Sequence, residues 1–335
     1  MGRISSLFVH RVLACVDARV DTDALLREVG VDPDASADAA VMVRDVDYYE
    51  MLERLADEDP RAADLPLRVG ARMRCADFGA VGLAMQSAPT LVAGWQRCAR
   101  YGRFLTSVST YGVEETPDAA DLHLYRAGER RTGLCMSNEA TLAGLYAISS
   151  EVAAQPFRPQ AVFFRHAART SPDVHEAHFG CPVHFDSDRD ALRVAREVLE
   201  GPNRLGDEST MRFFDAHLEQ ELARRSASAP VDVRVRTCIA RSLSEGVPTV
   251  SEIAAQLGTS GRTLQRQLAD VDRTFQGLVD EARRHAAERL LAEPDYPLAD
   301  VAFLTGFSEQ SALTRAFRRW TGTTPRAFRL KRRSA

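Results

Sequence analysis

Two stretches near the C-terminal end of the chain follow the same plan, and they constrain the fold more than any other feature. The first is IAAQLGTSGRTLQRQL, residues 253–268, and the second is VAFLTGFSEQSALTRAF, residues 301–317. Each has the pattern of a short helix, a glycine turn and a second helix, and the turn glycines Gly258 and Gly306 are 48 residues apart. Glycine adopts the positive φ that a sharp turn between helices requires. The repeat therefore predicts two helix-turn-helix units in an all-α region.

The second helix of each unit is predicted to be amphipathic. Leu264 and Leu268 in the first unit, and Leu313 and Phe317 in the second, are spaced to lie on one buried face. The opposite faces carry the polar residues Arg262, Thr263, Gln265 and Arg266 in the first unit, and Glu309, Gln310, Ser311, Thr314, Arg315 and Arg318 in the second. Such a face is typical either of a solvated helix or of a helix that contacts DNA.

The pairing of the two units favours DNA. Arginine pairs with guanine, glutamine with adenine, and hydroxyl groups with phosphates or base edges. Helix N-termini, here expected to be capped by Ser260 and Ser308, receive phosphate oxygens. A long helix expected over residues 275–293 can hold the two second helices about one DNA turn apart, roughly 34 Å. We therefore predict contacts with double-stranded DNA at Ser260, Arg262, Thr263, Gln265, Arg266, Ser308, Gln310, Ser311, Thr314, Arg315 and Arg318.

The charge is unevenly distributed along the chain. The net charge is −4, yet residues 231–335 hold 17 Lys and Arg against 12 Asp and Glu, and the remainder holds 26 against 35. A basic smaller part joined to an acidic larger part indicates that only the smaller part contacts a polyanion.

A chain of 335 residues is too long for one typical core. The stretch ARRSASAPVD, residues 223–232, interrupts two helical patterns as a linker would. We predict a domain over residues 1–225, a linker over 226–232 and a DNA-binding domain over 233–335. The first domain has helical patterns at 44–58, 87–108 and 138–152, and strand patterns at 121–125, 161–166, 183–185 and 191–194, which predict an α+β fold. It has no nucleotide-binding glycine loop and no GxSxG motif.

Residues 235–330 closely resemble the C-terminal domain of the AraC/XylS transcription regulators. The resemblance is carried by TVSEIAAQLGTSGRTLQRQL and ERLLAEPDYPLADVAFLTGFSEQSALTRAFRRWTGTTPRAFR, and by their order and spacing. It implies base or groove contacts at Arg262, Gln265 and Arg266 in the first unit, and at Gln310, Ser311, Thr314 and Arg315 in the second. The chain departs from the family pattern at Asp272, where a glycine is usual. Asp tolerates left-handed backbone geometry, but Asp270 and Asp272 bring negative charge close to where a phosphate would lie, so it stays open whether the first unit contacts DNA fully.

The N-terminal half resembles the sensory domain of one AraC subgroup, of the type called arabinose-binding. DFGAVGLAMQSAPTLVAGWQRCARYGRFL and HFGCPVHFDSDRDALRV carry this looser resemblance, which covers roughly residues 10–200. It implies a small-molecule effector but not arabinose itself, and it assigns no effector-binding residues. The apolar residues Tyr101, Phe104, Leu105, Phe163 and Phe164 are candidates for a pocket wall, although packing in the core is the favoured interpretation.

The segment HEAHFGCPVH offers an alternative, a zinc site. Its ligand types would suit zinc, and they recur at intervals of three, at His175, His178, Cys181 and His184. However, Gly180 and Pro182 interrupt the helix that would align them, so we expect no metal site and no cofactor. The six cysteines lack CxxC spacing and are expected to be buried packing residues.

These patterns together predict a bacterial transcription regulator that is not an enzyme and that activates nearby metabolic genes. Its expected partners are promoter DNA, a small-molecule effector, RNA polymerase and a second copy of the chain. The effector is expected to shift the population that engages DNA. With no signal peptide and no long apolar run, we expect a cytoplasmic protein without membrane contact. Two alternatives stay open: an N-terminal enzyme fused to a DNA-binding module, and a basic tail, residues 326–335, that either contacts phosphate or is simply solvated.

Overall fold

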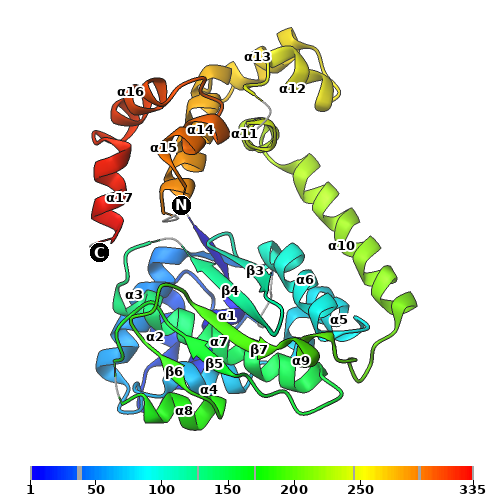
Figure 1. The fold of residues 1–335 in the computed structure, drawn as a ribbon, viewed down its shortest axis with the longest axis vertical. Coiled ribbons are helices and arrows are strands. Elements are labelled where there is room, and N and C mark those ends of the chain that lie inside the picture. The colour runs from blue at the N-terminus through cyan, green and yellow to red at the C-terminus, as the bar shows by residue number, and fades with distance from the viewer. Residues whose placement is uncertain are drawn as a thin grey trace. The chain divides into compact units, whose positions relative to one another are not determined.

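The computed structural model describes residues 2–35, 40–126, 128–169, 171–243, 246–292 and 296–333. The chain divides into two compact units, Met1–Gln220 and Glu221–Ala335 (Figure 1). The division falls inside a helix, α10 (Glu208–Ser228). The predicted linker, 226–232, thus comprises the end of α10, two further residues and the start of α11 (Val231–Ser242). The exact domain boundary stays a prediction.

The N-terminal unit combines helices with a five-stranded sheet, as the α+β prediction requires. Its helices are α1 (Ser6–Leu13), α2 (Thr22–Glu28), α3 (Asp45–Glu58), α4 (Leu65–Ala71), α5 (Gly79–Gln86), α6 (Leu91–Tyr101), α7 (Thr132–Val152), α8 (Asp173–Phe179), α9 (Arg196–Glu200) and α10, with short 3₁₀ turns η1 (Cys75–Phe78) and η2 (Gly102–Phe104). Its strands are β1 (Arg3–Ser5), β2 (Met42–Arg44), β3 (Ser109–Glu115), β4 (Ala119–Arg126), β5 (Ala161–Phe163), β6 (Val183–His184) and β7 (Ala191–Ala195).

The large sheet has the order β3-β4-β7-β5-β6, and β1 and β2 form a separate antiparallel pair. All neighbours in the large sheet are antiparallel except β5 and β6, which are parallel. The four predicted strand segments coincide with β4, β5, β6 and β7, whereas β3 was not anticipated. Because β3 pairs with β4 over its whole length, it completes the edge of the sheet next to α6.

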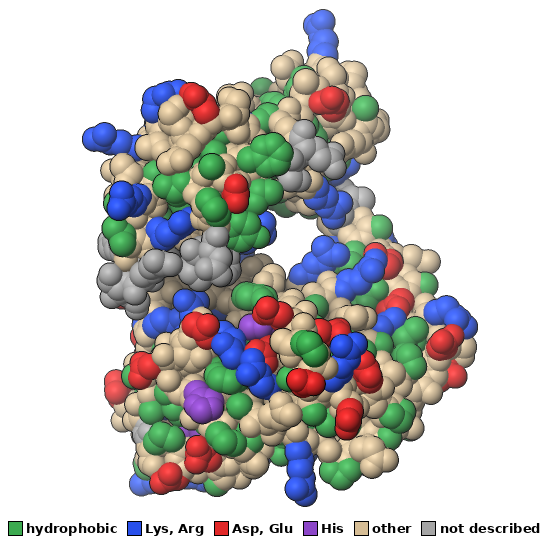
Figure 2. Space-filling model, viewed as in Figure 1, with side chains coloured by type: hydrophobic (Ala, Val, Ile, Leu, Met, Phe, Trp, Pro, Cys, Tyr) green, Lys and Arg blue, Asp and Glu red, His purple; other side chains and the backbone are tan. Residues whose placement is uncertain are grey.

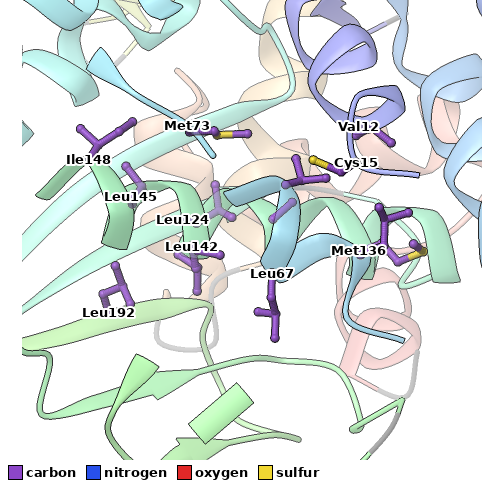
Figure 3. Packing of buried hydrophobic residues seen from close by; sticks show 14 of the residues in the cluster. Val12, Cys15, Leu67, Met73, Leu124, Met136, Leu142, Leu145, Ile148 and Leu192 are labelled. Carbon is purple, nitrogen blue, oxygen red and sulfur yellow. The ribbon is translucent and has the colours of Figure 1, made fainter. Parts of the chain in front are cut away.

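Helix α7 is the centre of the N-terminal core. Most of its 21 residues are buried, and it packs against α3 and α4. The approach of α4 is close, since a Cβ at Gly70 would lie 2.3 Å from the Cβ of Ala143. Figure 3 shows Leu142 and Leu145 of α7 among apolar side chains from the sheet and from α4. This arrangement places one face of α7 against the sheet, where it contacts β7.

The C-terminal unit is entirely helical in its described part, as predicted. Its helices are α11, α12 (Val250–Gln256), α13 (Gly261–Ala269), α14 (Phe275–Ala292), α15 (Leu298–Leu304), α16 (Gln310–Thr321) and α17 (Pro325–Arg333). It has two separate apolar cores, and α14 contributes to both. Leu278 and Ala282 belong to the core shared with α11, α12 and α13, while Ala287 and Leu291 belong to the core shared with α15 and α16. Figure 1 shows α14 between these two groups of helices.

Within the described ranges, no helix is both long enough and apolar enough to cross a bilayer.

Candidate nucleic-acid interface and ligand cavity

The two helix-turn-helix units close their turns in the same way. Gly258 and Gly306 have φ values of 69° and 75°, so both take the left-handed geometry predicted for them. In the first unit the amide of Thr259 donates to the carbonyl of Ala254 at 2.9 Å, and in the second the amide of Phe307 donates to the carbonyl of Ala302 at 2.9 Å. This bond satisfies a carbonyl at the end of the first helix. The predicted pair of helix-turn-helix units is confirmed.

The N-termini of α13 and α16 differ. The hydroxyl of Ser260 accepts a hydrogen bond from the amide of Thr263 at 3.1 Å, as predicted for a cap. The corresponding prediction for Ser308 is wrong. Helix α16 begins one position later, at Gln310, and its N-cap residue is Glu309, whose side chain makes no capping bond. Ser308 therefore lies outside the helix, where its hydroxyl is too early in the chain to reach a first-turn amide.

The predicted division into buried and outward faces is confirmed. Leu264, Leu268, Leu313 and Phe317 are at most 1% exposed. On the other side, Thr263 and Thr314 are half-buried, and the remaining predicted contact residues are exposed: Ser260, Arg262, Gln265, Arg266, Ser308, Gln310, Ser311, Arg315 and Arg318. Both helices thus offer polar side chains to a partner.

The polar groups on α16 are already engaged with one another. The hydroxyl of Ser311 donates to the Glu309 carboxylate at 2.5 Å, and the guanidinium of Arg315 lies 3.7 Å from the same carboxylate. The hydroxyl of Thr314 donates to the carbonyl of Gln310 at 2.9 Å. On α13, by contrast, the side chains of Arg262, Gln265 and Arg266 have no partner among the described residues. The arginines on the exposed face of α13 can therefore bind a ligand without breaking an existing interaction, whereas Arg315 on α16 cannot.

The unusual aspartate after α13 keeps the expected turn. Asp272 has a φ of 52°, and Gly322, which ends α16 in the equivalent place, has a φ of 74°. The following residue, Arg273, binds Glu281 of α14 with one guanidinium nitrogen 2.7 Å from each carboxylate oxygen. The substitution of aspartate for glycine is thus accommodated in the left-handed region, as the sequence indicated.

An arginine of the long helix, not anticipated from the sequence, holds the second turn. Arg283 of α14 donates to the carbonyls of Thr305 and Gly306, and its guanidinium lies 4.1 Å from the centre of the Phe307 ring. Burial lowers the pKa of Arg283, partly offset by Asp280. Asp280 in turn pairs with Arg319 of α16 at 3.2 Å. Only the folded arrangement of α14 against α15 and α16 reveals these roles, because nothing in the local pattern distinguishes Arg283 from a solvated helix residue.

Figure 2 shows how the charges are distributed on one face. On the part formed by the C-terminal unit, Arg side chains project from several places and carboxylates are sparse, whereas carboxylates are frequent on the N-terminal unit. This matches the charge asymmetry of the sequence and favours a polyanion as partner of the C-terminal unit.

The N-terminal unit contains an apolar cavity of about 620 Å³, counting the space open to solvent. Its wall is built from α1, η1, α5, α6, β3 and α7, and it consists of Phe8, Met73, Cys75, Phe78, Val81, Gly82, Met85, Cys98, Gly102, Leu105, Tyr111, Thr141, Gly144, Leu145 and Ile148. Of the apolar candidates singled out in the sequence, only Leu105 lies in this wall; Tyr101, Phe104 and Phe164 are buried elsewhere. Burial raises the pKa of Cys75 and of Cys98 to about 12, so both thiols stay protonated.

The histidines of the HEAHFGCPVH segment have separate partners. His175 is buried and its Nε2 lies 3.0 Å from the carboxylate of Glu139 on α7. His178 packs edge-on against Phe179, and His184 stacks on Phe163. Helix α8 ends before Gly180, which has left-handed geometry. Within the described ranges, no three His, Cys, Asp or Glu side chains are gathered as a metal site requires.

Comparison with known proteins gives two matching families. Residues 20–203 match the family described as "Arabinose-binding domain of AraC transcription regulator, N-term", and residues 253–331 match a helix-turn-helix domain family. The HTH-type transcriptional regulator VirS of Mycobacterium tuberculosis is 30% identical over 332 residues, covering 91% of this chain and 93% of that protein.

The ornithine utilization regulator of Pseudomonas aeruginosa is 27% identical over 265 residues, covering 79% of this chain and 78% of the relative. Among solved structures, the transcriptional regulator CdpR from Pseudomonas aeruginosa is 20% identical with a TM-score of 0.45, covering 96% of this chain and 98% of that one.

Proposed function

Because the chain belongs to the AraC family of DNA-binding transcription regulators, with a ligand-binding N-terminal domain, we propose that α13 and α16 together bind promoter DNA under the control of a small-molecule effector. The observation that carries this proposal is the pair of identically closed turns, each followed by a helix with an apolar face in a core and a polar face in solvent. A shared helix, α14, links the two units.

The contact residues follow from the exposed polar faces. On α13 we assign the contacts to Ser260, Arg262, Thr263, Gln265 and Arg266, and on α16 and the turn before it to Ser308, Gln310, Ser311, Thr314, Arg315 and Arg318. Arg262 and Arg266 are free to meet guanine or phosphate directly. Arg315 has to leave its ion pair with the Glu309 carboxylate before it can contact DNA. Ser308 lies outside α16, so its contact would be made by the turn.

The effector acts by binding one state of the protein better than another. We place it in the apolar cavity of the N-terminal unit, whose wall includes residues from α1, α7 and β3. We propose activation of nearby metabolic genes through RNA polymerase, in the cytoplasm, where such a regulator meets the chromosome. The name of the ornithine utilization regulator supports the metabolic part of this proposal.

We also propose that the working form is a homodimer. Phe213 on α10 is 68% exposed and its ring packs against that of Phe214, and aromatic side chains are enriched at protein interfaces. Sedimentation of the purified chain at several concentrations checks this part, and a strict monomer bound to DNA would contradict it.

We propose that the N-terminal unit binds its ligand without converting it. The matched relatives are transcription regulators, which supports this view. Incubation of the purified protein with a bound ligand, followed by product analysis, distinguishes the two functions. Turnover in the absence of DNA would favour an enzyme.

The DNA proposal is tested by fluorescence anisotropy with the DNA upstream of the protein's own gene. If 6–10 phosphates are contacted, affinity should fall by about 10³–10⁵ between 50 and 200 mM salt. Arg266→Ala should weaken binding and lower the salt slope if it contacts phosphate. Arg27→Ala is the matched control, because Arg27 is exposed on α2 in the N-terminal unit. A flat salt profile would contradict DNA binding by this surface.

A further inference from the structure

One buried arginine in the N-terminal unit lacks a carboxylate partner. Arg126, at the end of β4, is only 9% exposed. Its Nε and Nη2 donate to the hydroxyl of Ser109 at 3.1 and 2.8 Å, its Nη1 donates to the hydroxyl of Ser137 at 2.5 Å, and its Nη2 lies 3.4 Å from the hydroxyl of Thr141. No described carboxylate lies within 4.0 Å of this guanidinium.

Other arginines of the same unit show what is missing. Arg130 pairs with the buried carboxylate of Asp190 at 2.9 Å, and Arg193 binds Asp121 through two nitrogens at 2.7 and 2.8 Å. A buried charge is costly unless it is paired. Hydroxyl groups supply dipoles but no compensating charge. The surroundings of Arg126 therefore favour an anion that the described part of the chain does not provide.

The guanidinium also has hydrogen-bonding capacity left. It carries five N–H donors in a planar fork, and its four contacts go to only three hydroxyl oxygens. Nη1 makes one of these contacts although it has two N–H groups. A carboxylate is the anion whose two oxygens best match such a fork.

Arg126 faces a cavity that adjoins the apolar one. The second cavity holds about 350 Å³, counting the space open to solvent, and its wall includes Arg126, Ser137, Tyr48 and Thr106. The two cavities share four wall residues, which are Phe8, Met73, Tyr111 and Thr141. The smaller, more polar cavity, whose wall carries the positive charge of Arg126, thus adjoins the larger, apolar cavity.

The tyrosines add neutral donors at this junction. Burial raises the pKa of Tyr48 and of Tyr111, so neither contributes a negative charge near neutral pH. The hydroxyl of Tyr111 has no hydrogen-bond partner among the described residues, and its ring lies in both cavity walls. Tyr111 and Arg126 thus line the same second cavity.

We propose that the N-terminal cavity binds a monoanionic carboxylate with an apolar body, with the carboxylate at Arg126 and the body along Phe8, Met73 and Leu145. The inference rests on the proposed function in one respect, that this ligand is the effector. A sugar fits the site poorly, because the wall of the larger cavity is almost wholly apolar and a polyol needs many hydrogen-bond partners.

The first test uses the full-length wild-type protein and pairs of probes, with binding measured by isothermal titration calorimetry. Octanoate and 4-phenylbutyrate should bind at least about ten-fold more tightly than octan-1-ol and 4-phenylbutan-1-ol, because only the acids pair with the guanidinium. L-Arabinose is the polyol control. Equal affinity for acid and alcohol, preference for arabinose, or no binding of either acid would overturn the proposal.

The second test uses Arg126→Met, which keeps the length of the side chain and removes its charge. Octanoate affinity should fall by at least about ten-fold while octan-1-ol affinity is unchanged. Arg193→Met is the matched control, since Arg193 lies in the same sheet but in neither cavity wall. Circular dichroism verifies folding, and the wild-type comparison of acid with alcohol stands even if Arg126→Met fails to fold. Unchanged octanoate binding by folded Arg126→Met would overturn the assignment.

The failure of this inference is distinguishable from the failure of the proposed function. Salt-dependent binding to the upstream DNA with no affinity for either acid would overturn the ligand class alone. Octanoate binding by a protein that never binds DNA would contradict the proposed function and support the ligand class. A change in DNA affinity on adding octanoate, absent in Arg126→Met, would support both.

Discussion

The two helix-turn-helix units share a backbone plan and differ in the electrostatics of their second helices. Both turns close with the same kind of amide-to-carbonyl bond, from Thr259 to Ala254 in the first unit and, 48 positions later, from Phe307 to Ala302 in the second. The first unit has free arginines on α13 and its carboxylate, Asp272, in the loop after the helix. The second has its carboxylate, Glu309, at the start of α16, bound to Ser311 and Arg315. The repeated pattern thus determines the geometry of the backbone, while we propose that single side chains determine how each unit contacts DNA.

The largest expected contrast concerns the turn glycines. A Cβ at Gly306 would lie 3.1 Å from Val247 and 3.3 Å from the carbonyl of Leu243, whereas a Cβ at Gly258 has no neighbour within 4 Å. Left-handed geometry costs a non-glycine residue about 1–2 kcal/mol, and crowding adds about 1–3 kcal/mol. Gly306→Ala should therefore lower the free energy of unfolding by about 2–5 kcal/mol, and Gly258→Ala by about 1–2 kcal/mol. Urea denaturation measures both, and equal losses would show that crowding at Gly306 is relieved by local movement.

The next contrast concerns Arg315 and Arg266, at matching surfaces of α16 and α13. Arg315→Ala should cost about 1–3 kcal/mol of DNA-binding free energy and relax specificity at one base position. The measurement is anisotropy on a set of single-base variants of the upstream DNA. Arg266→Ala is the parallel variant on α13. A small and uniform loss on every sequence would mean that Arg315 contacts only phosphate.

A smaller effect is expected at Asp272. Asp272→Gly should raise the free energy of unfolding by about 0.5–1 kcal/mol, because glycine takes left-handed geometry without steric strain. Thermal unfolding measures the change. Gly322→Ala is the reciprocal variant and should be destabilising, since Gly322 has a φ of 74° at the equivalent place. A destabilised Asp272→Gly would indicate that the aspartate side chain contributes more than its backbone strain removes.

The smallest effect is expected at Glu309. Glu309→Gln removes a negative charge from the N-terminus of α16 and releases Arg315, so DNA affinity should rise a few-fold. The same change should weaken α16 slightly, because a carboxylate near the N-terminus of a helix stabilises it by about 0.3–1 kcal/mol. Anisotropy and thermal unfolding measure the two opposite shifts. Unchanged DNA affinity would place Glu309 away from the bound phosphates.

The sequence predicted the C-terminal unit better than the N-terminal one, for a physical reason. Turn glycines and apolar residues at helical spacing act locally, so Gly258, Gly306, Leu264 and Phe317 reveal both units without knowledge of the fold. The cap at Ser308 was mispredicted because α16 starts one residue later than the strict repeat implies. The similarity of two turns does not extend to the first residue of the next helix.

The ligand site that we propose at Arg126 was not predictable in the same way. Arg126 and Ser109 are 17 residues apart in sequence and become partners only because β3 pairs with β4. Ser137 and Thr141 reach them from α7, on which they resemble ordinary small polar residues. What distinguishes Arg126 is that no described carboxylate lies near its guanidinium in the folded protein. The sequence alone does not show which residues will surround a side chain, so it could not reveal this feature.

Helix α14 determines how far one DNA-binding unit is rotated about the helix axis relative to the other. Its 18 residues extend over roughly 27 Å, and successive residues are rotated by about 100°. One residue inserted between Ala282 and Ala287 would turn the second core through about 100° relative to the first while lengthening the helix by only about 1.5 Å. A one-residue change in the length of α14 thus alters the relative rotation of the two cores much more than the distance between them. The DNA site should accordingly tolerate a small stretch between its two contacted segments more readily than a change in the side of the duplex on which they lie.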